Sequence, residues 1–420
     1  MGTTAVPTTP LVLAPPPSPR AILTARVKRL AAGCGLSISA VTNAEAFPEL
    51  AERLQRHIAA GYVAGLDWFT PERARFATDP RNLHPGAVSI LAVGVAYWSV
   101  DPGKPDDGVP RGRIARYAWG VDYHDLLKER MGHLHRAIEE EIGRPVEARL
   151  LVDTARIVDR AVAARAGLGW YGKHSCLIVP GRGSGVLLGE LLLDVDLEPD
   201  APLDKHCGRC SICIDRCPTG AIVAPYTVST PRCLSFQTIE QRGAIPVPLR
   251  PLLGDWVFGC DICQEVCPYT KAARLPPDPA FLPRAVDNAY PSLPLLLAMD
   301  ETRFRALFRG TPVTRAKRRG LARNAAIALA NVGSEADLPT LVTAVRDHDE
   351  PLVRGHAAWG IARLCDRLGR AVPRSARALL DRARRGDPDG FVREEARNAI
   401  ESGDREHGAA PGSTGLKARA

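Results

Sequence analysis

The sequence predicts a multidomain α+β protein with three successive parts: an α/β domain, a short cysteine-rich domain and a helical repeat domain. Three observations predict this order. Helical and strand patterns alternate up to about residue 197, eight of the 11 cysteines fall between residues 207 and 267, and a helical motif recurs after residue 300. The predicted domains are 21–199, 200–275 and 276–402, flanked by a disordered leader at 1–20 and a disordered tail at 403–420.

The overall composition is that of an ordinary globular protein. The 420 residues are 45% hydrophobic and 24% charged, which suits two or three domains with buried cores. The longest apolar run, residues 90–98, is far shorter than the roughly 18 residues that a membrane span needs. Because residues 1–20 also lack the basic region of a secretory signal, we expect a cytoplasmic protein without membrane association, whose cysteines are not paired in disulfides.

The positive charge is concentrated near the C-terminus. Residues 1–300 contain 32 Lys and Arg against 32 Asp and Glu, whereas residues 301–420 contain 23 against 15. The formal net charge of +8 therefore lies in the last 120 residues. A basic region on a neutral body indicates an anionic partner such as nucleic acid, although a solvated Arg-rich surface fits the charge alone equally well.

The first domain is predicted from six segments. Apolar strands are expected at 88–100, 148–152 and 185–193, and helices at 21–31, 123–142 and 156–166, the last followed by Gly167. Asp153 comes directly after the second of these strands. Its local sequence favours a helix N-cap over a functional acid. No GxGxxG motif at a strand-helix junction and no Walker A loop are present, so the sequence gives no support for a nucleotide cofactor.

The cysteines of the second domain follow the spacing of bacterial ferredoxins. The run Cys207-x2-Cys210-x2-Cys213-x3-Cys217-Pro places three thiols around one cubane and turns the fourth toward another cluster. A second run and one intervening cysteine complete two [4Fe–4S] ligand sets. We expect one cluster on Cys207, Cys210, Cys213 and Cys267, and the other on Cys217, Cys233, Cys260 and Cys263.

Two clusters side by side form a short relay that delivers electrons to another redox centre. Zinc is the main alternative ligand, because paired Cys-x2-Cys motifs also bind zinc. Zinc sites seldom use the compact four-cysteine run, however, so iron–sulfur clusters are favoured.

The third domain contains an internal repeat. Residues 323–333 recur at 354–364, a period of 31 residues, and more faintly at 392–400. Small residues at helical spacing, together with Pro339 and Pro351 at expected helix starts, favour paired helices stacked as a short HEAT-like solenoid. An ordinary helical bundle is the alternative.

Taken together, three sequence stretches resemble one enzyme family. They are residues 151–176 (LVDTARIVDRAVAARAGLGWYGKHSC), the two cysteine runs, and residues 318–326 (RRGLARNAA). In this order they are similar to epoxyqueuosine reductases over roughly residues 21–400. The resemblance implies a nitroreductase-like first domain that binds cobalamin (vitamin B12, as cob(II)alamin) and is related to the corrinoid-binding part of reductive dehalogenases. It also implies reduction of epoxyqueuosine to queuosine at the wobble position of tRNA, the last step of queuosine biosynthesis.

The same resemblance implies roles for individual residues. Asp153 matches the proton donor of the family, and we expect an apolar, cofactor-covered setting to raise its pKa. Segments similar to cobalamin-contacting segments contain Arg75, Tyr117, His174, Leu177, Leu188 and Ser235, besides Asp153. The helical repeats would bind the anticodon stem-loop, with phosphate contacts from Arg315, Lys317, Arg318, Arg319, Arg323 and Arg354.

The remaining partners and the alternatives follow from the same features. An external electron donor such as ferredoxin or flavodoxin would reduce the clusters, and nothing in the sequence requires more than a monomer. A corrinoid reductase of a small molecule, similar to a reductive dehalogenase, is a second hypothesis, but it would need no basic repeat domain. A non-enzymatic iron–sulfur electron carrier is a third, although it would leave the first domain without a role.

Overall fold

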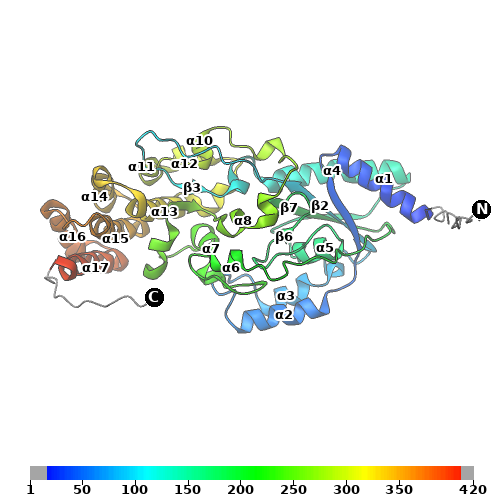
Figure 1. Cartoon of the computed structure of the whole chain (residues 1–420), viewed down its shortest axis with the longest axis horizontal. Coiled ribbons are helices and arrows are strands. Elements are labelled where there is room, and N and C mark those ends of the chain that lie inside the picture. The colour runs from blue at the N-terminus through cyan, green and yellow to red at the C-terminus, as the bar shows by residue number, and fades with distance from the viewer. Residues whose placement is uncertain (1–16, 408–420) are drawn as a thin grey trace, which may run out of the picture.

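A computed structural model describes residues 17–407, with side chains to residue 402. Its three parts follow one another along the long axis of the molecule: a sheet flanked by helices, the cysteine-bearing segment in the middle, and stacked helices at the other end (Figure 1). Among the described helices, none combines the length and the apolar character that a bilayer crossing requires.

The first part is built on a four-stranded sheet with the order β1-β2-β7-β4, in which every neighbouring pair is antiparallel. The central strands β2 and β7 pair along their whole length, from Ser89 opposite Leu193 to Ala96 opposite Val186. The bounds of the four strands are β1 (Ile38–Asn43), β2 (Ser89–Ala96), β4 (Ala148–Val152) and β7 (Val186–Leu193).

The predicted α/β class of this part is therefore wrong, because an antiparallel sheet makes it an α+β domain. Alternation of helices and strands along the chain does not fix strand direction. Each connection between strands of this sheet contains more than one helix or strand. Such long connections allow the next strand to run either parallel or antiparallel to the one before it. The strand and helix predicted at 148–152 and 123–142 have the observed bounds.

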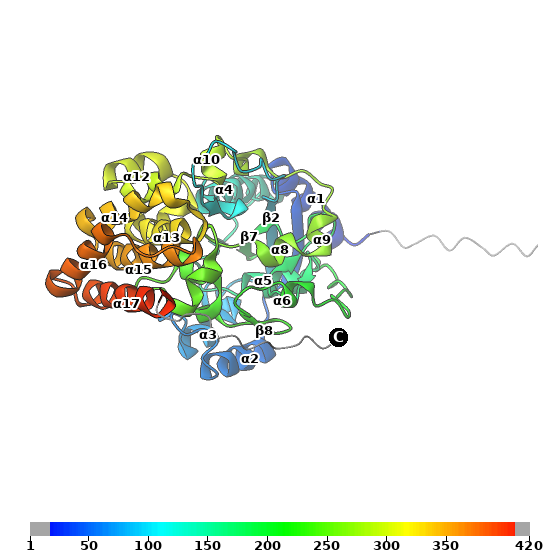
Figure 2. The same ribbon diagram turned by 60° about the vertical axis from the view of Figure 1, so that its left-hand side comes forward.

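Helices cover both faces of the sheet. On one face, α1 (Pro19–Gly33) and α4 (Tyr123–Ile142) bury an apolar core with Leu91 and Leu191. On the other face, α5 (Asp159–Arg165) packs through Val162, and Figures 1 and 2 place α2 (Pro48–Ala59) and α3 (Pro71–Ala77) beyond it. Helix α5 starts three residues later than predicted, and Gly167 follows it with a positive φ of 75°.

The cysteine-bearing segment consists of short elements and is stabilised by packing against both neighbouring parts. Strand β10 (Trp256–Phe258) pairs in parallel with β3 (Arg113–Ile114) of the preceding part. Ile114 and Trp119 lie in the core of the helical repeats, and Phe281 lies in the core of the sheet domain. The three parts therefore share cores across the predicted boundaries. The other short elements up to residue 271 are β5 (Trp170–Tyr171), β6 (Leu177–Ile178), α6 (Ile212–Asp215), β8 (Ile222–Ala224), β9 (Thr227–Val228), α7 (Leu234–Ile239), α8 (Ile262–Glu265) and α9 (Pro268–Lys271).

The last part is a stack of paired helices, as the 31-residue period predicts. Helices α13, α15 and α17 pack side by side, and α14 and α16 pack against them as a second layer. Small residues permit the close approach: a Cβ atom on Gly355 would lie 2.3 Å from the ring of Phe391. The helices are α10 (Val286–Ala289), α11 (Leu293–Ala298), α12 (Glu301–Phe308), α13 (Lys317–Val332), α14 (Leu338–Asp347), α15 (Pro351–Arg367), α16 (Arg374–Gly386) and α17 (Gly390–His407).

The predicted leader and tail lie largely outside the described residues. Within the described part, α1 begins at Pro19 and is capped by the Ser18 hydroxyl, which accepts a hydrogen bond from the amide of Ala21. Helix α17 continues to His407. Both predicted boundaries therefore need correction by a few residues.

Candidate active site

Asp153 stands at the end of β4 with an unusual backbone conformation. Its φ of 38° is rare for a residue other than glycine, and such strain is often found at functional sites. The Tyr123 hydroxyl donates a hydrogen bond to Asp153 Oδ2 over 2.6 Å, and His124 Nε2 lies 3.5 Å from the same oxygen. The Asp153 side chain is 58% exposed. The start of α4 thus holds a carboxyl group that a substrate can still reach.

A second carboxylate completes a three-residue chain. Asp122, the N-cap of α4, lies 2.8 Å from His124 Nδ1 through its Oδ1. Contacts with Asp122 and Asp153 raise the pKa of His124 to about 9. His124 is therefore protonated at neutral pH.

The expected rise in the pKa of Asp153 is not present in this structure. Burial raises the pKa of Asp153, but the contacts with His124 and Tyr123 outweigh it, so the pKa lies below its usual value. The physical reason is that a cationic imidazole and a hydroxyl donor stabilise the carboxylate form. At neutral pH the proton of this group rests on His124.

Aromatic side chains lead from Asp153 toward the cysteine-bearing segment. The ring of Tyr117 lies 6.2 Å from that of Tyr123, 6.3 Å from that of Tyr97 and 6.0 Å from that of Phe258. Gln264 of α8 donates a hydrogen bond to the Tyr97 hydroxyl over 2.9 Å. Tyr117, an expected cobalamin contact, therefore lies between Asp153 and the second cysteine run.

The thiols of the first expected cluster lie together. Burial, followed by the charges of Cys207, Cys267 and Cys210, raises the pKa of Cys213 to about 11. Cys267 comes from the second run, so the two runs cross as the ferredoxin spacing requires. This donor set fits a [4Fe–4S] cluster.

The other four thiols form a second group. Burial and the charges of Cys233 and Cys217 raise the pKa of Cys260, and Cys260 and Cys233 act in the same way on Cys263. Among the side chains described, those of residues 17–402, no three His, Cys, Asp or Glu converge as the ligands of a single ion would. In a cubane each thiolate instead binds its own iron.

The hairpin of β5 and β6 fastens the first cysteine run. Lys173 donates hydrogen bonds to the carbonyls of Gly208 and Cys210, each over 2.8 Å. His174 is buried beside Cys267, where it lowers the pKa of that thiol against the effect of burial. The sequence analysis expected His174 at the corrin and assigned no role to Lys173. The available signal was the polar Lys-His pair within an otherwise apolar and glycine-rich stretch.

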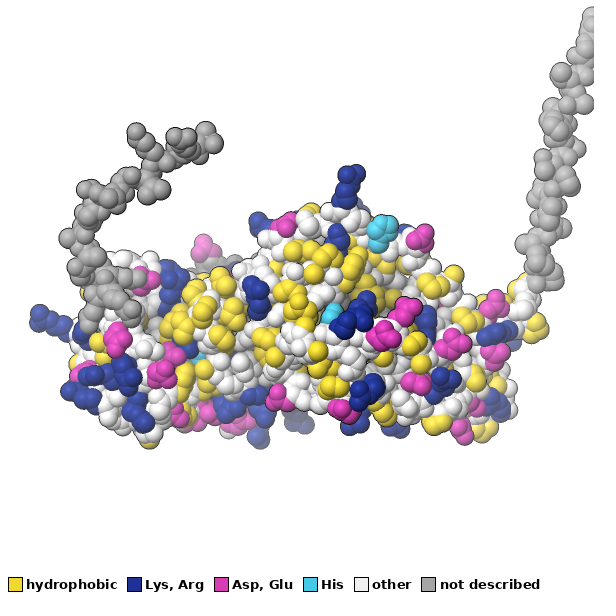
Figure 3. Space-filling view, turned by 90° about the horizontal axis from the view of Figure 1, so that it is seen from below, with side chains coloured by type: hydrophobic (Ala, Val, Ile, Leu, Met, Phe, Trp, Pro, Cys, Tyr) yellow, Lys and Arg dark blue, Asp and Glu magenta, His cyan; other side chains and the backbone are white. Residues whose placement is uncertain are grey.

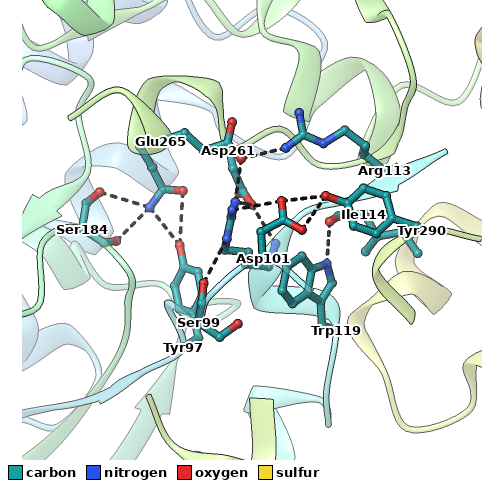
Figure 4. A network of polar contacts seen from close by, with 12 residues as sticks. Tyr97, Ser99, Asp101, Arg113, Ile114, Trp119, Ser184, Asp261, Glu265 and Tyr290 are labelled. Atoms are coloured by element: carbon teal, nitrogen blue, oxygen red, sulfur yellow. Dashed lines mark hydrogen bonds and ion pairs between the residues drawn. The ribbon is translucent and has the colours of Figure 1, made fainter. Parts of the chain in front are cut away.

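A buried arginine fastens the second cysteine run. Arg116 is 8% exposed and contacts Asp261 and Glu265 over 3.3 and 2.7 Å. Figure 4 shows these two carboxylates near Asp101 and Tyr290, which hydrogen-bond to each other. Because Asp261 lies between Cys260 and Cys263, the network ties their spacing to the sheet domain. Sequence reasoning did not find this network.

The remaining expected cobalamin contacts are distributed unevenly. Leu177 is buried and Leu188 half-buried in the core on the α5 side of the sheet. The backbone amides of Ser235 and Phe236 point at the sulfur of Cys233. Arg75 is exposed and pairs with Glu72 over 3.2 Å. The structure therefore places Arg75 at the outer surface and the other residues closer to the cysteines or the core.

Four exposed basic residues lie in the loop after α7, in the segment that leads into α13 and in the first turn of α13, and one of them, Arg315, lies within reach of Asp153. Arg242, Arg315, Lys317 and Arg319 are exposed, and we call them the basic rim. Arg315 donates two hydrogen bonds to Glu240, of 2.9 and 3.0 Å, and lies within electrostatic reach of the Asp153 carboxylate. Arg242 was missed because it precedes the repeats in the sequence. On the face drawn in Figure 3, Lys and Arg side chains are scattered widely and also gather at the end formed by the repeats.

Three of the expected phosphate contacts serve the fold instead. Arg323 is 1% exposed and donates hydrogen bonds to the carbonyls of Gln237, Gln241 and Gly243, so its assignment as a phosphate contact is wrong. The reason is that its helix face packs onto the loop after α7. Arg318 and Arg354 are each 12% exposed and pair with acidic residues, Asp349 and Asp387 respectively.

Comparison with known proteins gives matches in all three parts. Residues 78–154 match the family model described as epoxyqueuosine reductase QueG, DUF1730; residues 206–270 match a 4Fe-4S double cluster binding domain, and residues 314–401 match HEAT repeats. The epoxyqueuosine reductase of Xanthomonas campestris is 38% identical over 341 residues, which cover 80% of this chain and 95% of the relative. The chain belongs to the epoxyqueuosine reductase family. The resemblance inferred from the sequence is thereby confirmed, and the protein is an oxidoreductase.

Solved structures of the family agree with this assignment. A structure of epoxyqueuosine reductase with a tRNA-Tyr epoxyqueuosine-modified stem loop is 31% identical, with a TM-score of 0.83. The match covers 91% of this chain and 98% of that one. The enzyme from Bacillus subtilis, solved with its catalytic aspartate loop swung out of the active site, matches with the same identity and TM-score over 91% and 99% of the two chains.

Proposed function

We propose that this protein reduces epoxyqueuosine to queuosine in tRNA, with Asp153 as the proton donor. The observation that carries the proposal is the position of Asp153. It is held by Tyr123 and His124 at the end of β4, and an aromatic cluster leads from it toward the second cysteine run. An acid beside an electron relay is the combination that a reductive C–O cleavage needs.

The eight grouped cysteines are the proposed ligands of the two [4Fe–4S] clusters. A cobalamin would lie between them and Asp153, in contact with Tyr117, Leu177, Leu188 and Ser235, with His174 toward Cys267 and Arg75 at the edge. The fit rests on β7: Val186, Leu187 and Leu188 are only half-buried, whereas Leu191 to Leu193 are completely buried. An uncovered apolar strand end suits a large, mostly apolar macrocycle. When bound, cobalamin supplies an electron-rich cobalt, reduced through the clusters, that gives electrons to the epoxide carbon.

The residues of this chain supply the proton chemistry. An epoxide oxygen is a poor leaving group unless it is protonated, so a positioned acid is required. His124 carries the proton at neutral pH and passes it to Asp153, which donates it to the oxygen. Asp122 stabilises the imidazolium form of His124. Covering the site with cofactor and RNA weakens solvation of the Asp153 carboxylate and favours this transfer.

The basic rim is the proposed docking surface for the anticodon stem-loop. Arg315, Lys317 and Arg319 retain their expected role, and Arg242 joins them. Because Arg315 lies within electrostatic reach of Asp153, phosphates bound at the rim would bring an unstacked wobble base toward the carboxyl group. Neutralised phosphates release counterions, so we expect binding to weaken as salt rises.

The remaining partners are proposed on chemical grounds. Low-potential clusters accept electrons from small carriers, so a ferredoxin or flavodoxin type donor is proposed. A reducing cytoplasm would preserve the free thiols, and binding of one stem-loop by one solenoid requires only a monomer.

Mass spectrometry of tRNA nucleosides tests the proposal. Anaerobically prepared holoenzyme is incubated with a chemical reductant and tRNA that carries epoxyqueuosine. We expect epoxyqueuosine to be converted into queuosine, and no conversion without reductant. Unchanged tRNA together with reduction of an organohalide would support a small-molecule reductase instead. If neither tRNA nor an organohalide is converted, the result would support the hypothesis of a non-enzymatic electron carrier.

A further inference from the structure

Two carboxyl groups lie beneath the Asp153 loop and take no part in the mechanism described above. Glu190, in the middle of β7, is completely buried, and neither of its side-chain oxygens has a hydrogen-bond partner. Asp159, the first residue of α5, is partly exposed, but its Oδ1 atom is buried and also unpartnered. The two carboxyl groups interact with each other, and the charge of Asp153 reaches both.

The surroundings of this pair favour the protonated form. Glu190 lies opposite Ala92 of β2 and Leu151 of β4, so both flanking strands present apolar side chains at its register position. Arg160 of α5, Tyr171 of β5 and Asp153 are the titratable groups that face Asp159, and Asp153 also faces Glu190. Burial raises the pKa of both members, and the repulsion between them adds to it for Glu190. The pair therefore holds at least one proton at neutral pH.

The reaction needs more protons than Asp153 alone carries. Conversion of the epoxide to an alkene breaks both C–O bonds, consumes two electrons and two protons, and releases the oxygen as water. His124 and Asp153 share a single proton at neutral pH. A second proton must reach the same oxygen while bound tRNA restricts access of solvent.

We propose that Asp159 and Glu190 form a proton store that returns Asp153 to its acid form for the second protonation. The proposal rests on the role of Asp153 in the proposed function. When the proton of the pair lies on Glu190, it passes first to the Asp159 carboxylate, and the Asp159 carboxyl group then donates it to the Asp153 carboxylate. The resulting negative charge stays on the pair until tRNA leaves and solvent protonates Asp159. Asp159 and Glu190 act through Asp153 and do not touch the substrate.

Isosteric variants test this store. Glu190→Gln and Asp159→Asn retain shape and polarity but have no proton to release, and Glu140→Gln on the exposed side of α4 serves as a matched control. In single turnovers of reduced holoenzyme with a saturating stem-loop, we expect both variants to form queuosine at least about tenfold more slowly. The slowing should increase with pH, while cluster and cobalamin spectra and stem-loop affinity remain those of the wild type. The control should react at the wild-type rate.

Infrared spectroscopy provides a measurement that does not depend on turnover. A protonated carboxyl group gives a C=O stretching band that shifts in D₂O. We expect this band in the protein at neutral pH, and expect Glu190→Gln to remove it. Should Glu190→Gln fail to fold, Asp159→Asn at the partly exposed position carries the rate measurement, and we expect it to shift the band, because the Glu190 carboxyl group loses the carboxyl group beside it.

The outcomes separate this proposal from the assignment of Asp153. Wild-type rates and pH profiles in both variants, or the absence of the band, would overturn the proton store. If Asp153→Asn abolishes turnover in the same assay, the general acid still stands. Full turnover by Asp153→Asn would overturn the assignment of Asp153 as the proton donor, and with it the proton store, while the reductase activity itself would stand.

Discussion

The cysteine-bearing segment and the Asp153 loop are built in opposite ways. The cysteine-bearing segment is held to its neighbours by hydrogen bonds and ion pairs from three basic side chains, Lys173, Arg116 and Arg323. Asp153 is more than half exposed, has a strained backbone, and is held by two side chains only. The difference follows from chemistry: thiolates must keep fixed distances to assemble clusters, whereas a proton donor must meet a substrate that enters from solvent.

Removing the acid should have the largest effect on activity. Asp153→Asn keeps the shape of the side chain but cannot donate a proton to the epoxide oxygen. We expect single-turnover formation of queuosine to fall by about 10²-fold or more. Both clusters and cobalamin should remain bound, as judged by optical and EPR spectra. The control is Asp125→Asn, at an exposed position in the first turn of α4, and this variant should react at the wild-type rate.

Removing the buried Arg323, which holds the cysteine-bearing segment to the helical repeats, should have the largest effect on stability. Arg323→Met leaves the carbonyls of Gln237, Gln241 and Gly243 without their charged donor, so we expect the free energy of unfolding to fall by about 3 kcal/mol. Arg319→Met at the exposed rim should change it by less than about 0.5 kcal/mol. Denaturant unfolding of the two variants compares them directly. Equal effects would contradict the distinction between a buried arginine that stabilises the fold and an exposed arginine that binds RNA.

The features predicted best from the sequence are those that depend only on the spacing of residues along the chain. The cysteine pattern predicts the two clusters of the matched double cluster domain, and its crossed ligand sets agree with the way the thiols are grouped. The apolar periodicity of residues 123–142 gives α4 with its observed bounds. The α/β class was mispredicted, because helices and strands that alternate along the chain can also form an antiparallel sheet when the connections are long. Arg323 was misassigned because charge alone does not reveal that a helix face packs onto a neighbouring loop. The partners of Asp153 come from α4, 30 residues away in the sequence, so no local pattern shows that they lower its pKa.

Changes at the basic rim should weaken RNA binding without affecting the fold. The double variant Lys317→Ala with Arg319→Ala removes two exposed charges, so we expect the affinity for an anticodon stem-loop to fall by about tenfold at low salt. The dependence of binding on salt should also become shallower, because fewer counterions are released. Fluorescence anisotropy at several salt concentrations measures both quantities. Arg303→Ala on the exposed side of α12 is the control, and an equal loss there would argue for nonspecific charge.

The smallest effect expected is the pH dependence of stability due to His124. Its folded-state pKa of about 9 lies above the unfolded value of 6.5, so its contribution is fully present below pH 6.5 and is lost as pH rises through 9. We expect His124→Gln to lower the free energy of unfolding by about 1 to 2 kcal/mol at pH 6.5 and by much less at pH 9.5. In an Asp122→Asn background the difference should shrink, because Asp122 is the main partner of the imidazolium. A difference that does not vary with pH would mean that His124 contributes packing only, and that the proton assigned to it resides elsewhere in the loop.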